Sequence, residues 1–416
     1  MALQGCLVIV AECPTELAGA LAAAGAFGIV ETNVEDAPAA ITAAKPAAIV
    51  LADPQAATDL PLANILTHKV TAAAPIIPVI ARLPLDGALA YREALPVALD
   101  APVSVLAARL SAALRVRTLH GAVLRRAEAA KGDGRPLPPA RNNDPLDDAT
   151  VIVAGRARSY PALAVAIGER VGLIGALSIE TAAQYLKARD VDGLVVGDGF
   201  NPQDLQALLS LLAEDSKFRE LPIGLLDGAA VALDHKLPGL VQSSDPALLV
   251  AHILPYVRLH AFEMRLKRIL ASLDAEGVLD PDTGLLRPDA FARDLERAIR
   301  DARERDSGLS IARLVFELNL APRASVDAAR LVSRLVRQVD FGCQEEDGSV
   351  LIAFTETDLR HAHVIARRIA GVLKDTMLQL DRRQPMAPAV TLAVLKSSDT
   401  ASALLARVST PAVAAE

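Results

Sequence analysis

Short runs of apolar residues alternate with Ala- and Leu-rich segments of helical spacing over the first two thirds of the chain. The apolar runs are typical of buried strands, and three pairs of them correspond, the second pair at an offset of 198 − 53 = 145 residues. These pairs are 7–11 with 151–154, 49–53 with 194–198, and 75–81 with 222–227. Strands that alternate with helices predict two doubly wound α/β domains with parallel sheets, related by tandem duplication.

Two stretches without apolar periodicity divide the chain into thirds. Residues 131–148 are rich in Pro, Gly, Asn and Asp, and residues 274–284 are similarly punctuated. A long helical stretch begins with Asp245 as a plausible N-cap, and Pro255 is expected to kink or interrupt it. This helix suits a stalk, and an ordinary closing helix is the alternative. We expect a first domain over 1–130, a linker over 131–148, a second domain over 149–260, a stalk helix or linker over 261–279, a third domain over 280–408 and a tail over 409–416.

The last third has a different order of elements, which predicts a separate α/β domain. Helices are expected at 289–305, 325–339, 358–374 and 401–408, and strands at 309–318, 349–354 and 389–395.

Composition narrows the possible functions. Of 416 residues, 52% are hydrophobic and 22% charged, which is typical of a globular protein. The net charge is 43 − 50 = −7 without a block of like charge, which argues against a nucleic-acid duplex or an anionic membrane as partner. Aromatic residues make up only 3%, so stacking platforms for single-stranded nucleic acid are not expected.

The cysteines and the first residues indicate the compartment. Cys6, Cys13 and Cys343 form no C-x-x-C pair, and an odd, scattered set fits a reducing cytoplasm. No apolar run approaches the roughly 18 residues that span a bilayer, and the start lacks the basic region of a signal peptide. We therefore expect a cytoplasmic protein without membrane insertion.

Each of the first two domains resembles the receiver domain of response regulators. In that family two acids bind Mg²⁺, an Asp after the third strand accepts phosphate, and a Lys pairs with it. Here only Glu12 remains of the first acid pair, and Asp53 lies at or one place beyond the acceptor position. In the second copy Gly197 or Asp198 occupies that position, without metal ligands or the Lys. The resemblance implies two degenerate receiver domains kept as scaffolds, with Asp53 as the candidate phosphoacceptor.

The last third resembles a GGDEF domain, the diguanylate cyclase fold, over about 130 residues. Residues 280–286 are close to the family's D-x-L-T-G-L-x-N-R motif. At the signature turn, 346–350, Gly-Gly is replaced by Glu346 and Asp347, and 317–319 read Glu-Leu-Asn where the family has Asp-x-Asp. These losses affect metal and phosphate together, so we expect an inactive cyclase. The domain order resembles that of the PleD-like and PopA-like response regulators of alphaproteobacteria.

One pattern of that family survives. Arg337 and Asp340 form an R-x-x-D, and five residues separate its Asp from the signature position, as in the family's product-binding inhibitory site. The second arginine of that site corresponds to Arg368. A guanidinium can form a fork with guanine or phosphate, and a carboxylate can accept from guanine N–H groups. The resemblance therefore implies a cyclic di-GMP site without a metal or cofactor. The alternative is a solvated Arg–Asp ion pair at a helix end.

The resulting hypothesis is a non-catalytic cyclic di-GMP effector and adaptor in signal transduction. The resemblance implies a homodimer, partners among signalling or protease-adaptor proteins, a position at the cell pole, and a role in cell-cycle control and regulated proteolysis. The alternatives are a ligand-free protein–protein scaffold, and a residual diguanylate cyclase or phosphorylation switch.

Overall fold

The computed structural model describes most of the chain. The described residues are 5–11, 16–26, 28–52, 62, 76–83, 93–132, 134, 143–156, 158–226, 237–275, 278–316, 322–375 and 388–409. The chain divides into two compact units. Residues 6–117 and 140–267 form the N-terminal unit, and residues 118–139 and 268–416 form the C-terminal unit.

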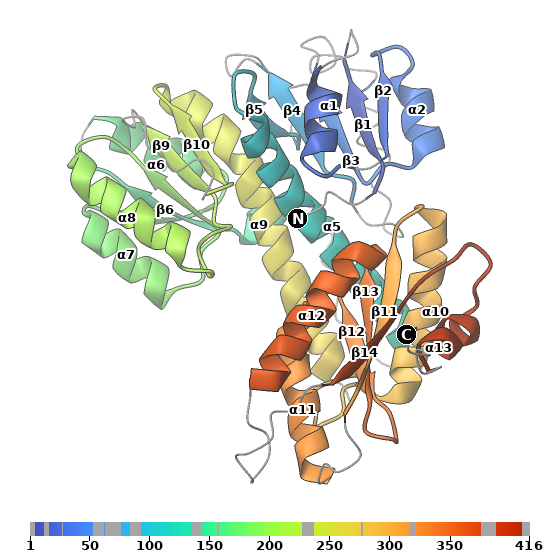
Figure 1. Ribbon diagram of the computed structural model, residues 1–416. Helices are drawn as coiled ribbons and strands as arrows, with labels where there is room; N and C mark the ends of the chain where they lie inside the picture. Colours follow the sequence, from blue (N-terminus) through green and yellow to red (C-terminus); the bar gives the residue numbers. More distant parts are fainter. Residues whose placement is uncertain are drawn as a thin grey trace. The chain divides into compact units, whose positions relative to one another are not determined.

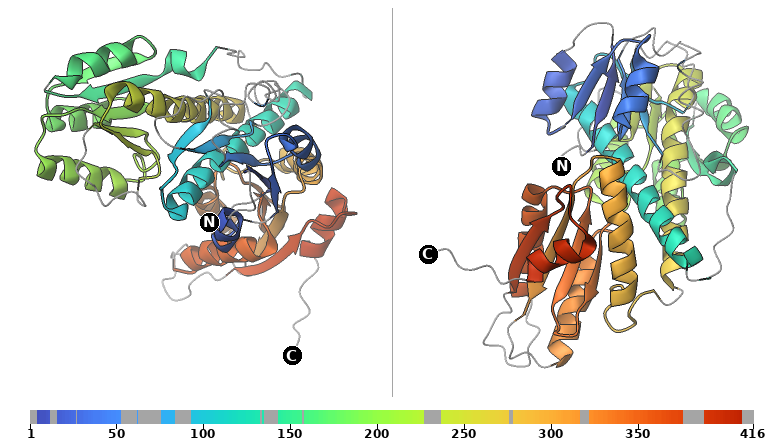
Figure 2. Two further views of the ribbon diagram at one scale, coloured as in Figure 1. Left: turned by 90° about the horizontal axis from the view of Figure 1, so that it is seen from above. Right: turned by 90° about the vertical axis from the view of Figure 1, so that its right-hand side faces the viewer.

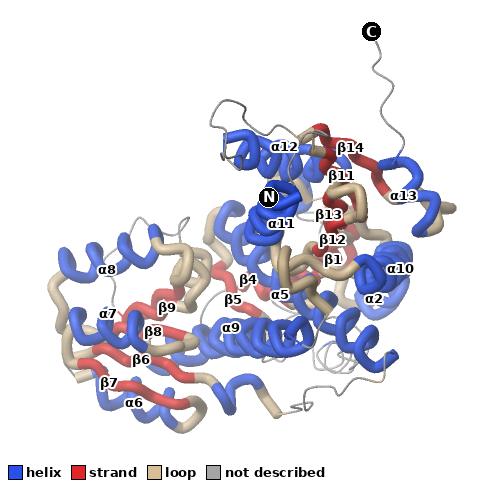
Figure 3. The backbone as a smooth tube through the Cα atoms, turned by 90° about the horizontal axis from the view of Figure 1, so that it is seen from below, coloured by secondary structure: helices blue, strands red, loops and turns tan. Residues whose placement is uncertain are grey.

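The N-terminal unit contains two five-stranded parallel sheets (Figures 1 and 3). The first has the order β2-β1-β3-β4-β5 and the second β10-β9-β8-β6-β7, so each has the doubly wound order 2-1-3-4-5 along its own sequence. The strands of the first sheet are β1 (Leu7–Val10), β2 (Ile29–Thr32), β3 (Ala48–Leu51), β4 (Val79–Leu83) and β5 (Leu95–Ala98). Those of the second are β6 (Thr150–Ala154), β7 (Gly172–Ala176), β8 (Gly193–Val196), β9 (Ile223–Leu226) and β10 (Leu240–Ser243).

Helices follow the strands along the chain. The helices labelled in Figure 1 for this part of the sequence are α1 (Glu16–Ala23), α2 (Ala37–Ala44), α5 (Val103–Gly132), α6 (Ser159–Gly168), α7 (Ile179–Ala188), α8 (Pro202–Glu214) and α9 (Pro246–Ala275), with a short 3₁₀ helix at Pro145–Asp148. Two of these helices begin at a residue whose side chain caps the first turn. Ser178 accepts the N–H of Thr181 before α7, and Asn201 accepts the N–H of Gln203 before α8.

The central strands form because their sequences are continuous apolar runs. All four residues of β1, β3 and β8 are buried, as expected for strands covered on both faces of a parallel sheet. The prediction of parallel α/β sheets in the first two thirds is confirmed by this topology.

Helices α5 and α9 are joined within the N-terminal unit by polar contacts. The Tyr256 hydroxyl, on α9, donates to the carbonyl of Pro96 at 2.7 Å. Arg109, on α5, donates to the same carbonyl at 2.8 Å and to that of Leu240, and its guanidinium lies 5.1 Å from the centre of the Tyr256 ring. Carbonyl oxygens at the edges of both sheets are thus satisfied by side chains of the two helices.

Helix α9 is continuous through Pro255, where the sequence predicts a kink or an interruption. The helix runs from Pro246 to Ala275 with Pro255 inside it, so the interruption does not occur. Its neighbours Leu254, Tyr256 and Val257 are all buried, so packing on both sides of the proline offsets the lost backbone hydrogen bond.

The C-terminal unit contains a four-stranded antiparallel sheet in the order β12-β13-β11-β14. The strands are β11 (Leu309–Val315), β12 (Phe341–Gln344), β13 (Val350–Thr355) and β14 (Ala389–Val394). The helices are α10 (Pro288–Glu304), α11 (Pro322–Leu335), α12 (Leu359–Asp375) and α13 (Ala401–Ser409). From β11 onward the succession β-α-β-β-α-β is that of a ferredoxin-like split βαβ fold (Figures 1 and 2).

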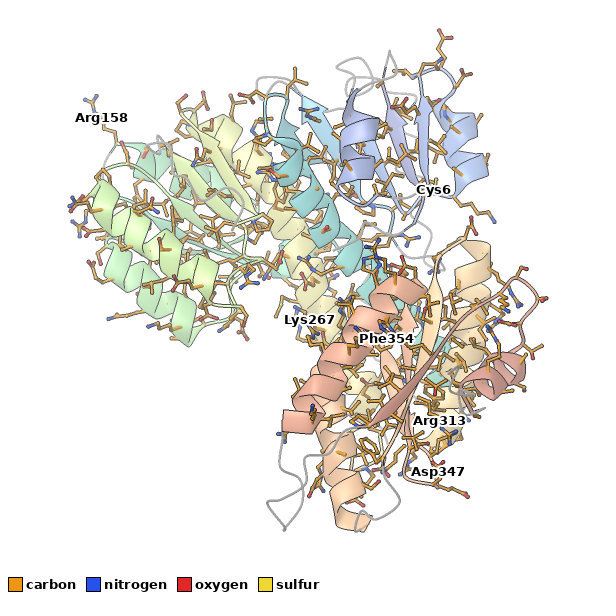
Figure 4. All side chains as sticks on the ribbon, in the orientation of Figure 1. Cys6, Arg158, Lys267, Arg313, Asp347 and Phe354 are labelled. Carbon is orange, nitrogen blue, oxygen red and sulfur yellow. The ribbon has the colours of Figure 1, made fainter. Side chains whose placement is uncertain are left out.

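Helices cover both faces of this sheet. Apolar residues of α11 and α12 pack against one face in a core that includes Phe354, labelled in Figure 4 and fully buried. Residues of α10 and α13 form the core on the other face. Helical spacing explains the docking, since Phe291, Leu295 and Ile299 are buried on one side of α10. No described helix has both the length and the apolar character that crossing a bilayer requires.

Candidate ligand-binding site

The R-x-x-D segment forms a tight turn between α11 and β12. Helix α11 ends at Leu335, four residues before the predicted end, and the Asp340 N–H donates to the Arg337 carbonyl at 3.0 Å. Arg337 is exposed and Asp340 is 6% exposed. The two side chains therefore belong to a turn and not to a helix end, and one faces solvent while the other faces the interior.

Asp340 is held by the far end of β13. Its Oδ1 accepts the backbone N–H of Thr355 at 3.0 Å, and the Thr355 hydroxyl donates to the carbonyl of Val339 at 3.1 Å. The other carboxylate oxygen, Oδ2, is buried and has no hydrogen-bond partner among the described residues. One oxygen is thus structural, and the second has unused capacity to accept a hydrogen bond.

Burial dominates the electrostatics of Asp340. Loss of solvent raises the pKa of its carboxyl group to about 7, against the opposing effects of the Arg337 charge, the Thr355 hydrogen bonds and the Arg125 charge from α5. A proton on this group near neutral pH avoids a buried negative charge. A guanine N–H directed at Oδ2 would favour the ionised form.

Arg337 and Asp340 line the same cavity, which has a volume of about 470 Å³. This size lies within the range of small-molecule sites, which are commonly about 300–1,000 Å³. The cavity is also lined by Arg126 of α5 and Asp274 of α9, in segments that belong to the C-terminal unit. Apolar side chains complete it, among them Leu270.

The D-x-x-T-G segment forms part of the cavity wall. Asp280 Oδ1 accepts the backbone N–H groups of Asp282 and Thr283, at 3.0 and 2.8 Å, and the Thr283 hydroxyl at 3.0 Å. Gly284 follows with φ +72°, a left-handed conformation that favours glycine, and a Cβ there would meet the Ser333 hydroxyl at 3.3 Å. The motif therefore serves to place a compact loop beside α11.

A buried charge cluster lies beside the cavity. The Arg126 guanidinium is 2.6 Å from Asp294 Oδ2 through Nη1 and 3.1 Å from Asp274 Oδ1 through Nε. Neither nitrogen makes a hydrogen bond among the described residues, because its N–H is not directed at the carboxylate. Burial raises the pKa of both Asp274 and Asp294, and the positive charge of Arg126 opposes this increase.

Arg368 lies apart from this cavity. It is exposed on α12, whose buried side carries Ala366 and Ile369, and it is not among the residues that line the cavity. The structure brings together two of the three residues assigned from the sequence, with Arg126 as a further cation.

The signature turn joins β12 to β13 and is occupied by an ion-pair cluster (Figure 4). Arg313 of β11 contacts Asp347 Oδ2 at 2.5 Å and Glu345 Oε2 at 3.5 Å, and donates to the Ser349 hydroxyl at 3.1 Å. Although partial burial acts in the other direction, hydrogen bonds from Ser349 and the Arg313 charge lower the pKa of Asp347. The turn therefore carries a cluster of carboxylates and a cation instead of bare glycine backbone.

Several positions that the sequence assigned to phosphate or metal chemistry are not described by the structure. These are Glu12 and Asp53 of the first domain, and residues 317–319, where the cyclase family has its metal-binding acids. In the second sheet, Asp198 follows β8 and its Oδ1 accepts the Ser159 hydroxyl. In the described ranges no three or more His, Cys, Asp or Glu side chains are grouped so that they could hold a metal ion.

Sequence reasoning missed the part of the cavity contributed by α5 and α9. Arg126 is 340 − 126 = 214 residues before Asp340, and its local sequence, Leu-Arg-Arg-Ala-Glu, looks like a solvated helix surface. No spacing pattern relates Arg126 to Asp274 or Asp294. The weak signal was the basic pair Arg125-Arg126 inside an Ala- and Leu-rich helix.

Comparison with known proteins gives only remote similarities. No family profile matches the chain, and no curated protein matches it. Among solved structures, the coiled coil and GGDEF domain of DgcB from Caulobacter crescentus, in complex with c-di-GMP, is 16% identical with a TM-score of 0.30, over 35% of this chain and 83% of that one. The FimX GGDEF domain from Pseudomonas aeruginosa is 15% identical with a TM-score of 0.29, over 32% of this chain and 88% of that one. Diguanylate cyclase SiaD of Pseudomonas aeruginosa, in complex with its activator SiaC, is 15% identical with a TM-score of 0.31, over 35% of this chain and 61% of that one.

Proposed function

We propose that this protein is a non-catalytic cyclic di-GMP effector, which binds the nucleotide in the cavity lined by Arg337 and Asp340. One observation carries the proposal: the exposed Arg337 lines a cavity of about 470 Å³ together with Asp340, whose buried Oδ2 has no hydrogen-bond partner among the residues that the structure describes. Arg337 would bind a phosphate or the O6/N7 edge of guanine, and Asp340 Oδ2 would accept guanine N1–H and N2–H.

Absence of catalysis is supported by the signature turn. Arg313, Glu345 and Asp347 form their own charge cluster there, so an incoming triphosphate would meet carboxylates instead of free backbone N–H groups. The expected observation is no cyclic di-GMP from GTP and Mg²⁺. Measurable product formation would overturn this part of the proposal.

The two parallel sheets of the N-terminal unit are proposed to be receiver-like domains that serve as interaction surfaces. Their strand order is that of doubly wound flavodoxin-like folds. In the second sheet, the Ser159 hydroxyl donates a hydrogen bond to the carboxylate of Asp198, one of the two residues that correspond to the phosphoacceptor. The adaptor role, the protein partners, the homodimer and the role in cell-cycle control follow from the resemblance of the sequence and are part of the same proposal.

Isothermal titration of the full chain with cyclic di-GMP tests the binding site. We expect Arg337→Ala to weaken binding at least about tenfold, because a charge-assisted hydrogen bond is lost. Arg334→Ala is the matched control, since Arg334 is an exposed arginine of α11 that does not line the cavity. Equal affinity of the wild type and Arg337→Ala would overturn the site. No binding by the wild type would favour the ligand-free scaffold.

A further inference from the structure

Arg126 has unusual surroundings for an arginine of a long helix. It is 9% exposed and lines the cavity together with Arg337 and Asp340. Its two nearest anions, Asp274 and Asp294, are within ion-pair distance, yet Nε and Nη1 make no hydrogen bond to them. A buried guanidinium whose N–H groups are not directed at its carboxylates retains hydrogen-bonding capacity for another acceptor.

The cavity is lined by two cations and two carboxyl groups of this chain. Arg126 and Arg337 contribute two positive charges, and Asp274 and Asp340 contribute two carboxyl groups. Asp294 lies beside Arg126 and is 3% exposed, with Arg125, Arg293 and Arg297 also acting on it. Asp294 therefore retains neighbouring cations if Arg126 turns toward a ligand, and Asp274 is the carboxylate that would lose its partner.

We infer that Arg126 is a ligand-binding residue of this cavity, where its guanidinium exchanges Asp274 for a phosphate oxygen of the bound nucleotide. The inference rests on the proposed function. Two guanidinium groups then match the two negative charges of cyclic di-GMP, and Asp274 acts as a built-in competitor for one of them. The affinity of the site is set in part by an acid on α9, outside the segment that carries the R-x-x-D pattern.

If Asp274 competes with the nucleotide for Arg126, substitutions at these two residues should change the affinity for cyclic di-GMP in opposite directions. Asp274→Asn removes the competing charge, so cyclic di-GMP should bind a few-fold more tightly than to the wild type. Arg126→Ala alone leaves two carboxylates with one cation fewer and can impair folding. The double variant Arg126→Ala/Asp274→Asn keeps the charge balanced, and we expect it to bind at least about tenfold more weakly than Asp274→Asn.

Titration of these full-length variants, with thermal melting to verify folding, distinguishes the outcomes. Arg115→Ala is the control, since Arg115 lies on the same helix and pairs with Glu220 instead. Equal affinity of Asp274→Asn and the double variant, with Arg337→Ala still weakened, would overturn the role of Arg126 and leave the proposed function intact. A wild type that does not bind cyclic di-GMP would overturn both.

Discussion

Asp340 Oδ1 accepts the backbone N–H of Thr355 at 3.0 Å, which joins the turn after α11 to the end of β13. The same carboxyl group is buried, and its pKa is raised to about 7. A folded-state pKa above the ordinary 3.8 means that the folded protein binds the proton more tightly than the unfolded chain. The stability contributed by this proton is complete below about pH 4 and is lost as the pH rises through about 7.

Replacing Asp340 with Asn should remove this pH dependence. The amide oxygen can still accept the Thr355 N–H, and no charge appears at high pH. The difference from the ordinary pKa corresponds to at most about 4 kcal/mol of unfolding free energy between pH 4 and 8. Denaturant unfolding at several pH values measures it. We expect the wild type to lose stability relative to the Asn variant between pH 5 and 8. If the two proteins had the same pH dependence over this range, the raised pKa of Asp340 would be contradicted.

Ligand affinity should follow the opposite trend with pH. If the ionised Asp340 accepts guanine N–H groups, binding favours release of the proton, and affinity falls as the pH drops below about 7. With only the ionised form competent, the loss reaches about 30-fold at pH 5.5 relative to pH 8. Titrations at these two values test it, with Asp340→Asn expected to show a flat profile. Stronger binding at pH 5.5 would show that the protonated acid binds instead.

Restoring glycine at the signature turn should not restore cyclase activity. Glu346→Gly/Asp347→Gly removes the two acids, but the Asp-x-Asp that holds the metal in active enzymes reads Glu-Leu-Asn at 317–319. A GTP turnover assay with Mg²⁺ is expected to give no product from this variant, as from the wild type. If the glycine variant formed product and the wild type did not, the turn would be the only part of the catalytic site that prevents activity.

Glu356 carries a backbone strain that can be measured separately from its side chain. It follows β13 with φ +49°, a left-handed conformation that is unfavourable for residues with a Cβ, and its carboxylate accepts the Thr118 hydroxyl. Glu356→Gly and Glu356→Ala both lose the carboxylate, but only glycine relieves the strain. We expect the glycine variant to be more stable than the alanine variant by about 1 kcal/mol. Equal midpoints in denaturant would mean that the backbone changes conformation in both.

The elements that could be predicted from sequence are those determined by local pattern. Continuous apolar runs such as Leu7–Val10 place the central strands, and helical periodicity places α12 within one residue of its observed ends. Where an element differs from the local pattern, contacts with residues distant in sequence explain the difference. Helix α11 ends early where Asp340 bonds Thr355 from another strand, and Pro255 stays helical because its neighbours are packed.

Only the part of the candidate site that lies within one short segment could be predicted from the sequence. Arg337 and Asp340 share one turn, so their spacing is visible in the sequence. Arg126 reaches the cavity because α5 folds beside the segment, and its separation in sequence hides this. Arg368 lies outside the cavity because its position on α12 points to solvent while Ile369 faces the core.

The cavity wall combines residues of α5, of α9 and of the segments between 279 and 342, which has a practical consequence for dissecting this protein. A fragment starting at residue 280 would keep the whole antiparallel sheet but lack the α5 and α9 surfaces that carry Arg126 and Asp274. Such a truncated piece would keep Arg337 and Asp340 but lose the cation and the acid that the two long helices contribute. Ligand screening on that excised piece would therefore sample only part of the cavity wall.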